Sequence, residues 1–251
     1  MNMNEKDILE IILSRYVTFV GGRYSRGKSL ILTFLSVMDM ILNNRNIIYS
    51  NMPLKFNNSG YKPIIKPFID TNFFDKIPLN SNILWDEMPN DISARAFNTT
   101  KNKYIGVIGV DIAKKNCRLR ATFQFGDTVD KILGLYCECI IIPEYINKYS
   151  DNTKEDNIKR IENKDFLQKW TIIDKRDNDV QYQLNINLYP IIFLYNTKFK
   201  PIPLFVNHDE YIERLKKSEL ERFEIKNPIE KLKRLENWNT GLKEIGKILI
   251  R

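Results

Sequence analysis

Gly21-Gly22-Arg23-Tyr24-Ser25-Arg26-Gly27-Lys28-Ser29 is the stretch that decides the fold of this 251-residue chain. From Gly22 onward it has the spacing G-x-x-x-x-G-K-S, which forms a phosphate-binding loop when a strand precedes it and a helix follows it. Residues 16–20 are β-branched and aromatic, as in a buried parallel strand, and residues 30–42 are apolar enough for a helix of about three turns or more. This order predicts an α/β P-loop NTPase fold.

The residue types of this loop match the chemistry of binding a nucleoside triphosphate. Glycines let the backbone turn its N–H groups toward phosphate oxygens, and the start of the next helix adds partial positive charge. We expect Lys28 to reach the β- and γ-phosphates and the Ser29 hydroxyl to bind Mg²⁺. The expected cofactors are therefore ATP and Mg²⁺. The residues expected to line the nucleotide are Gly22, Arg23, Tyr24, Ser25, Arg26, Gly27, Lys28, Ser29 and Leu30.

A second motif, Ile83-Leu84-Trp85-Asp86-Glu87, is typical of the strand that accompanies a phosphate loop. Its apolar residues predict a buried strand, and its two carboxylates follow at the edge where ligands bind in such sheets. We expect Asp86 to hold Mg²⁺ together with Ser29, and Glu87 to orient and deprotonate the attacking water. A site that only binds nucleotide has little use for such a base, so Glu87 favours hydrolysis.

A third candidate site residue, Gln124, ends a strand predicted at residues 118–124. This strand is expected to lie next to the one that carries Glu87. From there the amide of Gln124 can sense the γ-phosphate. The alternative is an ordinary solvated glutamine at the end of a strand.

Composition and charge narrow the class of protein. The chain has 39 Lys+Arg against 31 Asp+Glu, a net charge of +8, which favours an anionic partner such as nucleic acid. No apolar stretch approaches the roughly 18–20 residues that span a bilayer, and residues 1–7 lack the features of a secretory signal, so we expect a cytoplasmic protein without an integral membrane segment. Three cysteines without metal-ligand spacing and a single histidine argue against zinc and against histidine-based nucleophilic catalysis.

Two regions are expected along the chain. Residues 1–149 should form the ATPase core, with an amphipathic helix at 5–15 and a short strand at 47–50. Residues 150–251 should supply a charged linker, a β-hairpin region that completes the sheet and a helical extension, all in the same globular unit. Within this second region the predicted elements are strands at 169–174, 180–186 and 189–196 and helices at 209–223 and from 228 onward.

The order of these motifs resembles that of the FtsK/HerA superfamily of DNA-pumping ATPases. It is most similar to the short genome-packaging ATPases of archaeal and other membrane-containing viruses. The resemblance covers residues 15–145 well and the remainder loosely. The matching residues are 22–29, 83–87, Arg95, Lys114-Lys115, 122–124 and Val129-Asp130, with Tyr195-Asn196-Thr197 similar to a Tyr-Asp-Thr turn of that family.

The resemblance implies a RecA/FtsK-like, mainly parallel central sheet flanked by helices. It also implies a homo-oligomeric ring, a pentamer or hexamer, that moves double-stranded DNA and docks on a capsid or portal vertex protein. Such a motor would act in the host cytoplasm during virus assembly or in the virion. An arginine supplied across the subunit interface is expected, with Arg95 as the nearest match and Arg118 and Arg120 as competitors, while Lys114-Lys115 replaces the family's Arg-Lys pair.

Three other functions fit part of the pattern. A filamentous-phage assembly ATPase of the zonula-occludens-toxin type shares the loop and the Asp-Glu strand, but usually has a membrane-spanning segment. A small-molecule kinase shares the loop, but seldom needs two carboxylates at a strand end. A nucleotide-gated interaction protein with negligible turnover would have little use for Glu87.

Overall fold

The computed structural model describes residues 3–23, 26–52, 54, 64–67, 76–88, 110–124, 135–146, 160, 163 and 165–194. Several predictions lie outside these residues: those for Tyr24, Ser25, Arg95 and Val129-Asp130, and the helices at 209–223 and from 228 onward. Within the described part of the chain, none of the helices has the length and apolarity that a bilayer crossing requires.

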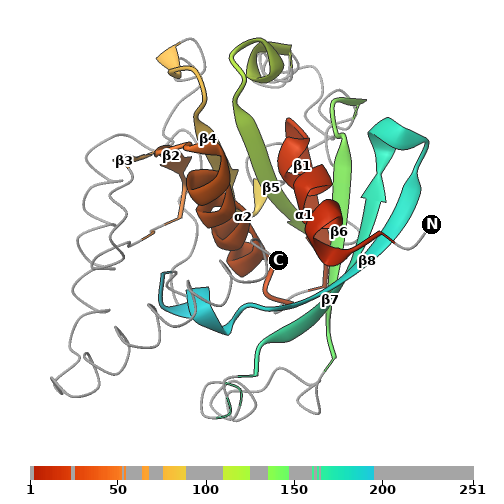
Figure 1. Ribbon diagram of the computed structural model, residues 1–251. Helices are drawn as coiled ribbons and strands as arrows, with labels where there is room; N and C mark the ends of the chain where they lie inside the picture. The colour runs from red at the N-terminus through yellow and green to blue at the C-terminus, as the bar shows by residue number, and fades with distance from the viewer. Residues whose placement is uncertain are drawn as a thin grey trace, which may run out of the picture.

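One sheet of eight strands organises the described residues, in the order β3-β2-β4-β5-β1-β6-β7-β8 (Figure 1). From β3 to β6 all neighbouring strands pair in parallel, whereas β7 and β8 pair antiparallel at one edge. The strands are β1 (Val17–Gly22), β2 (Ile47–Ser50), β3 (Ile64–Pro67), β4 (Asn82–Trp85), β5 (Arg118–Gln124), β6 (Cys139–Tyr145), β7 (Leu167–Asp174) and β8 (Val180–Asn187). The mainly parallel α/β sheet predicted from the sequence is confirmed.

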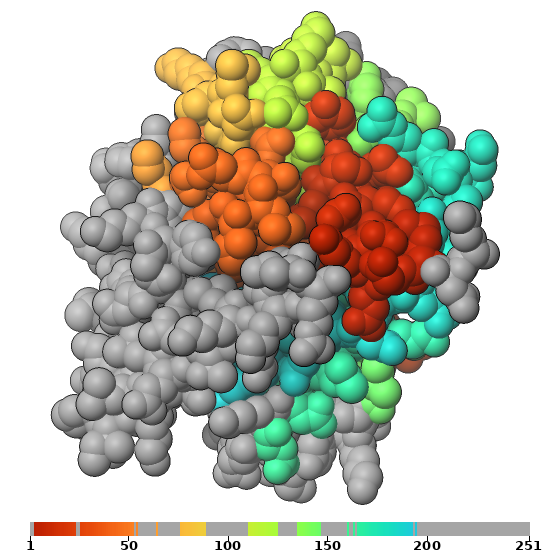
Figure 2. All heavy atoms as spheres, viewed as in Figure 1, coloured from red at the N-terminus to blue at the C-terminus, as the bar shows by residue number. Residues whose placement is uncertain are grey.

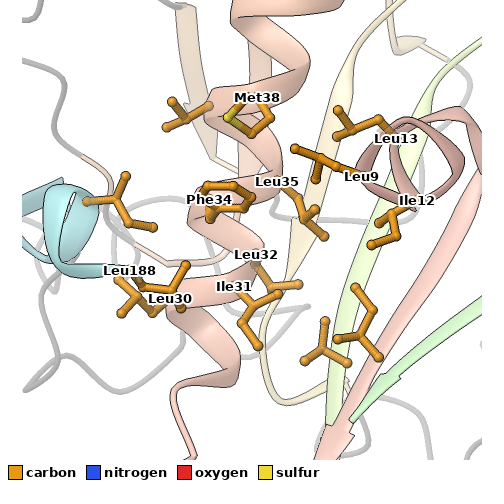
Figure 3. Packing of buried hydrophobic residues seen from close by; sticks show 14 of the residues in the cluster. Leu9, Ile12, Leu13, Leu30, Ile31, Leu32, Phe34, Leu35, Met38 and Leu188 are labelled. Atoms are coloured by element: carbon orange, nitrogen blue, oxygen red, sulfur yellow. The ribbon is translucent and has the colours of Figure 1, made fainter. Parts of the chain in front are cut away.

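Two helices, α1 (Glu5–Ser14) and α2 (Lys28–Asn43), cover one face of this sheet (Figure 1). In the space-filling view of the same face, α1 (red) lies at the surface beside the orange residues that follow it in the chain (Figure 2). The buried side of α1 and nearly the whole of α2 pack with inward side chains of β1, β4, β6 and β7 in one apolar cluster. Figure 3 shows Leu9 and Ile12 of α1 close to Leu35 of α2. This cluster holds the start of α2 firmly behind the phosphate loop.

The opposite face of the parallel strands buries a second apolar cluster. Its members alternate along each strand with those of the first, since successive side chains of a strand point to opposite faces. Val17 and Phe19 of β1, Ile83 and Trp85 of β4 and Leu119 of β5 belong to it. Both faces of the central strands are therefore buried, which explains their nearly continuous apolar sequences.

The predicted β-hairpin is present as β7 and β8. A short 3-10 turn, Lys175–Asp177, joins them, and the Asp174 carboxylate accepts a hydrogen bond from the Arg176 N–H at its start. Because β7 also pairs with β6, the hairpin extends the same sheet that contains β1. The boundary placed at residues 149/150 falls outside the described residues and stays a prediction.

The strand predicted at 189–196 is wrong. Residues Tyr189–Leu194 form the 3-10 helix η4. Leu188, Ile191 and Leu194 are buried at a spacing of three residues, which is the repeat of a 3-10 helix and places them on one side. Figure 3 shows Leu188 against Leu30 of α2. The part of this segment that the structure describes is therefore helical and not extended.

Candidate nucleotide-binding and hydrolysis site

The phosphate loop connects the carboxyl end of β1 to the first residue of α2. Gly27 precedes α2 in the left-handed conformation, with φ of 73°, which glycine adopts without strain. The ammonium group of Lys28 turns back into the loop, where Nζ donates to the carbonyl oxygens of Gly22 at 3.0 Å and Arg23 at 2.9 Å. Lys28 is buried. Its charge is therefore held inside the curve of the loop, as charge neutralisation of a bound phosphate requires.

Leu30 has a different place from the other residues expected at the nucleotide. Its side chain is buried in the apolar cluster on the α2 face of the sheet. Figure 3 shows it next to Leu188. Only the backbone of Leu30 is available to the loop, so its side chain contributes to packing.

Ser29 and Asp86 meet at the carboxyl edge of the sheet. The Ser29 hydroxyl donates to Asp86 Oδ2 at 2.7 Å, and the Thr122 hydroxyl donates to Asp86 Oδ1 at the same distance. Asp86 follows β4, and Thr122 lies on the neighbouring strand β5. Burial raises the pKa of the Asp86 carboxyl above its ordinary value, and the hydrogen bonds from Thr122 and Ser29 and the charge of Lys28 oppose this shift. The paired hydroxyl and carboxylate oxygens are ligands that suit Mg²⁺.

Glu87 stands in the turn directly after Asp86. Its backbone is left-handed, with φ of 52°, and its N–H donates to the Thr122 hydroxyl at 2.7 Å. The Thr122 hydroxyl thus accepts from Glu87 and donates to Asp86, using its single proton and one lone pair. The side chain of Glu87 is only partly buried. Its function as the base for the attacking water stays a prediction.

Asn51 is a site residue that sequence reasoning missed. It follows β2 and is almost fully buried. Its side-chain amide donates to the carbonyl oxygen of Asp86 at 2.9 Å, and its side-chain oxygen accepts from the Asp86 N–H at 2.8 Å. This double hydrogen bond holds the backbone of the carboxylate turn. The available signal was a polar residue at the end of a parallel strand, the edge at which such side chains gather.

Gln124 is the last residue of β5 and lies opposite Gly22 of β1 in the register. It is on the same face of the strand as Thr122, since the two are separated by one residue. The strand that carries it lies between β1 and β4, so Gln124 is placed between the phosphate loop and the turn of Asp86 and Glu87. Its function as a γ-phosphate sensor stays a prediction.

Arg118 and Arg120 lie near the opposite, amino edge of the sheet. Arg120 is fully buried and donates to Asp39 Oδ2 at 3.2 Å and to the carbonyl oxygen of Arg15 at 3.0 Å. Arg118 donates to the carbonyl oxygen of Leu13 at 3.0 Å, and burial lowers its pKa to about 10. Both guanidinium groups are hydrogen-bonded to other groups of the same chain. This removes them from the candidates for an arginine that reaches a neighbouring subunit.

No protein-family model matches this chain, and none of the curated proteins does. Among solved structures, it is similar to the genome-packaging NTPase of Sulfolobus turreted icosahedral virus 2 in complex with ATP-gammaS, at 13% identity and a TM-score of 0.44 over 68% of this chain and 97% of that one. It is also similar to the N-terminal domain of zonular occludens toxin from Neisseria meningitidis, at 12% identity and a TM-score of 0.49 over 73% and 100% of the two chains.

A third similar structure is the flagellar accessory protein FlaH from Methanocaldococcus jannaschii, at 15% identity and a TM-score of 0.44 over 74% of this chain and 91% of that one. At such low identity the likeness concerns the architecture, and the chemistry must be argued from the residues of the site. The chain has the fold of a P-loop NTPase.

Proposed function

We propose that this chain is an ATP-hydrolysing DNA translocase, a motor that packages double-stranded DNA into a viral capsid as a homo-oligomeric ring. The observation that supports hydrolysis is the hydrogen bond of 2.7 Å between Ser29 and Asp86, with Glu87 next in the chain. It brings a phosphate loop and a carboxylate turn, 57 residues apart in sequence, to one point.

Each residue of the site has a separate function in the proposed hydrolysis. Lys28 neutralises the phosphate charge, and Ser29 and Asp86 hold Mg²⁺. Since the Ser29 hydroxyl donates its hydrogen bond to Asp86, the lone pairs of its oxygen remain available to a cation. When bound, Mg²⁺ neutralises charge that develops on the phosphate oxygens. Glu87 accepts the proton of the attacking water, and the hydrogen bond of its N–H to Thr122 fixes the turn from which it acts.

The translocase part of the proposal is supported by the charge and by the order of the motifs. The net charge of +8 suits an anionic polymer, and the contacts of basic side chains with DNA phosphates would weaken with salt. Gln124, placed between the two halves of the site, would couple the state of the γ-phosphate to movement. Arg95 of a neighbouring subunit would stabilise the transition state, because its planar cation suits charge spread over a phosphoryl group. The ring would have five or six subunits and dock on a capsid or portal vertex protein.

The test is ATP hydrolysis by the full chain with and without double-stranded DNA, compared with Glu87→Gln. We expect DNA to stimulate turnover in the parent, and Glu87→Gln to lower turnover about 100-fold or more while still binding ATP, since general base catalysis contributes about 10²–10⁴-fold. Glu10→Gln is the matched control, because Glu10 is an exposed carboxylate on α1. It should hydrolyse ATP at the parental rate.

The outcomes separate the alternatives. Hydrolysis that is indifferent to DNA would contradict the translocase and leave an ATPase. ATP consumption that depends on an added small-molecule acceptor would indicate a kinase. Full turnover by Glu87→Gln would contradict the assignment of the base.

A further inference from the structure

Gln168 of β7 reaches the phosphate loop from the antiparallel edge of the sheet. Its side chain is fully buried, and its Nε2 donates to the carbonyl oxygen of Arg26, 142 residues away in sequence, at 3.0 Å. Its Oε1 accepts from Trp170 Nε1 at 2.9 Å. The indole N–H can only donate and the carbonyl can only accept, so these two partners fix which way the amide points. The amide is thus oriented to hold one peptide group of the loop.

Tyr145, at the end of β6, closes the same side of the loop. A Cβ atom added to Gly27 would lie 2.5 Å from Gln168 Nε2 and 2.8 Å from the Tyr145 hydroxyl oxygen, so both side chains pack directly against this glycine. The Tyr145 hydroxyl forms a hydrogen bond with Gln168, and the Arg160 guanidinium lies 4.1 Å above the Tyr145 ring. Arg160 is fully buried. These contacts leave the loop at Gly27 little room to move toward β7.

The peptide group between Arg26 and Gly27 is the part of the loop that these side chains restrain. In a trans peptide the C=O and the N–H point in opposite directions. When Gln168 holds the Arg26 carbonyl, the Gly27 N–H must therefore point away from Gln168. Gly27 also precedes α2, and its carbonyl accepts from the Ile31 N–H at 3.1 Å, so the helix start is fixed by the same residue. A phosphate loop binds through N–H groups that are oriented in this way.

We propose that Gln168 and Tyr145 are positioning residues that hold the Arg26–Gly27 peptide of the phosphate loop in its phosphate-binding orientation. This rests on the proposed binding of ATP and extends the site to the antiparallel strand β7. The hairpin β7–β8 then has a second function besides completing the sheet, because it sets the conformation of the loop before nucleotide arrives. The positioning residues touch the loop and not the nucleotide, so they act on affinity more than on the chemical step.

The test is nucleotide affinity and steady-state kinetics of Gln168→Glu and Tyr145→Phe in the full chain. Glutamate has the shape of glutamine but, when ionised, no donor for the Arg26 carbonyl. We expect Gln168→Glu to raise the Kd of a fluorescent ATP analogue and the KM for ATP about tenfold, and Tyr145→Phe about threefold, as the loss of single hydrogen bonds implies. In both variants kcat should stay within about twofold of the parent, since a residue that only positions the loop leaves the transition-state contacts in place.

Two further variants keep the result interpretable. A buried carboxylate costs stability, so Gln168→Met, which removes the donor without adding charge, provides the same readout if Gln168→Glu fails to fold. Gln183→Glu is the matched control, because Gln183 is an exposed glutamine on β8 of the same hairpin. It should bind the ATP analogue as tightly as the parent.

Different results would overturn the positioning function of Gln168 and Tyr145 and the proposed ATPase function. Parental affinity in the Gln168 and Tyr145 variants, with or without a lower melting temperature, would overturn the positioning function and leave the ATPase intact. A kcat that falls with an unchanged KM would also overturn it. A parent protein that binds no ATP analogue at all would overturn the proposed function itself.

Discussion

At opposite ends of the sheet, on the face covered by α2, the buried carboxylates of Asp86 and Asp39 have different kinds of partner. At the carboxyl edge, Asp86 accepts hydrogen bonds from the neutral hydroxyls of Ser29 and Thr122. At the amino edge, Asp39 of α2 lies 3.2 Å from the Arg120 guanidinium and 3.9 Å from that of Arg45. Both carboxylates are almost fully buried. The difference is the charge of the partners and not the degree of burial.

This difference supports the proposal that Asp86, and not Asp39, is part of a ligand site. Asp39 is neutralised within the chain, and it ties α2 to β5 through Arg120. Asp86 accepts from the neutral hydroxyls of Ser29 and Thr122, and in the proposed function Mg²⁺ would balance its negative charge. The charge of Lys28 lowers the pKa of Asp86, but its ammonium donates to loop carbonyls. The ion pairs of Asp39 therefore indicate a structural function, whereas the contacts of Asp86 fit the proposed Mg²⁺ site.

The largest expected effect is on stability at the amino edge. We expect Asp39→Asn to lower the free energy of unfolding by about 3–5 kcal/mol, because removing one partner leaves buried arginine charge uncompensated. Urea unfolding measures this change. Glu10→Gln, at an exposed pair in which Lys6 and Glu10 are 3.9 Å apart, should change it by less than about 1 kcal/mol. A loss below about 1 kcal/mol in Asp39→Asn would contradict the structural function of this carboxylate.

The opposite result is expected at the carboxyl edge. We expect Asp86→Asn to lower ATP turnover and Mg²⁺ affinity about 10–100-fold, as is usual when a group that holds or orients a metal is replaced. Its free energy of unfolding should fall by less than about 1 kcal/mol, since burial already disfavours the charged form of Asp86. Titration of Mg²⁺ in the ATPase assay and urea unfolding measure the two effects. A strongly destabilised protein with parental Mg²⁺ dependence would remove the distinction between the two edges.

A smaller effect is expected at Thr122, which joins Asp86 to Glu87. Thr122→Val keeps the shape of the side chain but removes the donor to Asp86 and the acceptor of the Glu87 N–H. We expect kcat for ATP to fall about fivefold, in line with the loss of about 1 kcal/mol for a hydrogen bond, with little change in nucleotide affinity. Thr122→Ser retains the hydroxyl and should restore most of the turnover. If serine and valine have equal effects, the hydroxyl has no positioning function.

The local part of the site could be predicted because its residues lie in two short motifs. Lys28, Ser29 and Asp86 were predicted from their spacing, and the structure brings all three to the carboxyl edge of the sheet. Asn51 and Gln168 could not be predicted, because no spacing links them to their targets. They act on Asp86 and Arg26 from 35 and 142 residues away, and only the pairing of strands makes these neighbours.

The positions of Arg118 and Arg120 relative to the nucleotide site also could not be predicted from local sequence. The sequence singles out Arg118 and Arg120 as cations within a strand that ends near the nucleotide. The strand direction then places them at its start, at the edge away from the phosphate loop. The prediction for residues 189–196 was wrong for a related reason. The segment is a nearly continuous apolar run, which suits a buried strand as well as a 3-10 helix, and the structure packs the 3-10 helix against α2.

The sequence by itself determined the fold class and the identity of the phosphate loop, because strand, glycine-rich loop and helix are each encoded by neighbouring residues. It also determined that a carboxylate pair follows a buried strand. Only the tertiary structure decided that Asp39 is paired with arginines whereas Asp86 accepts from neutral hydroxyls. That choice depends on the order and direction of strands in the sheet, which bring together residues that no local pattern connects.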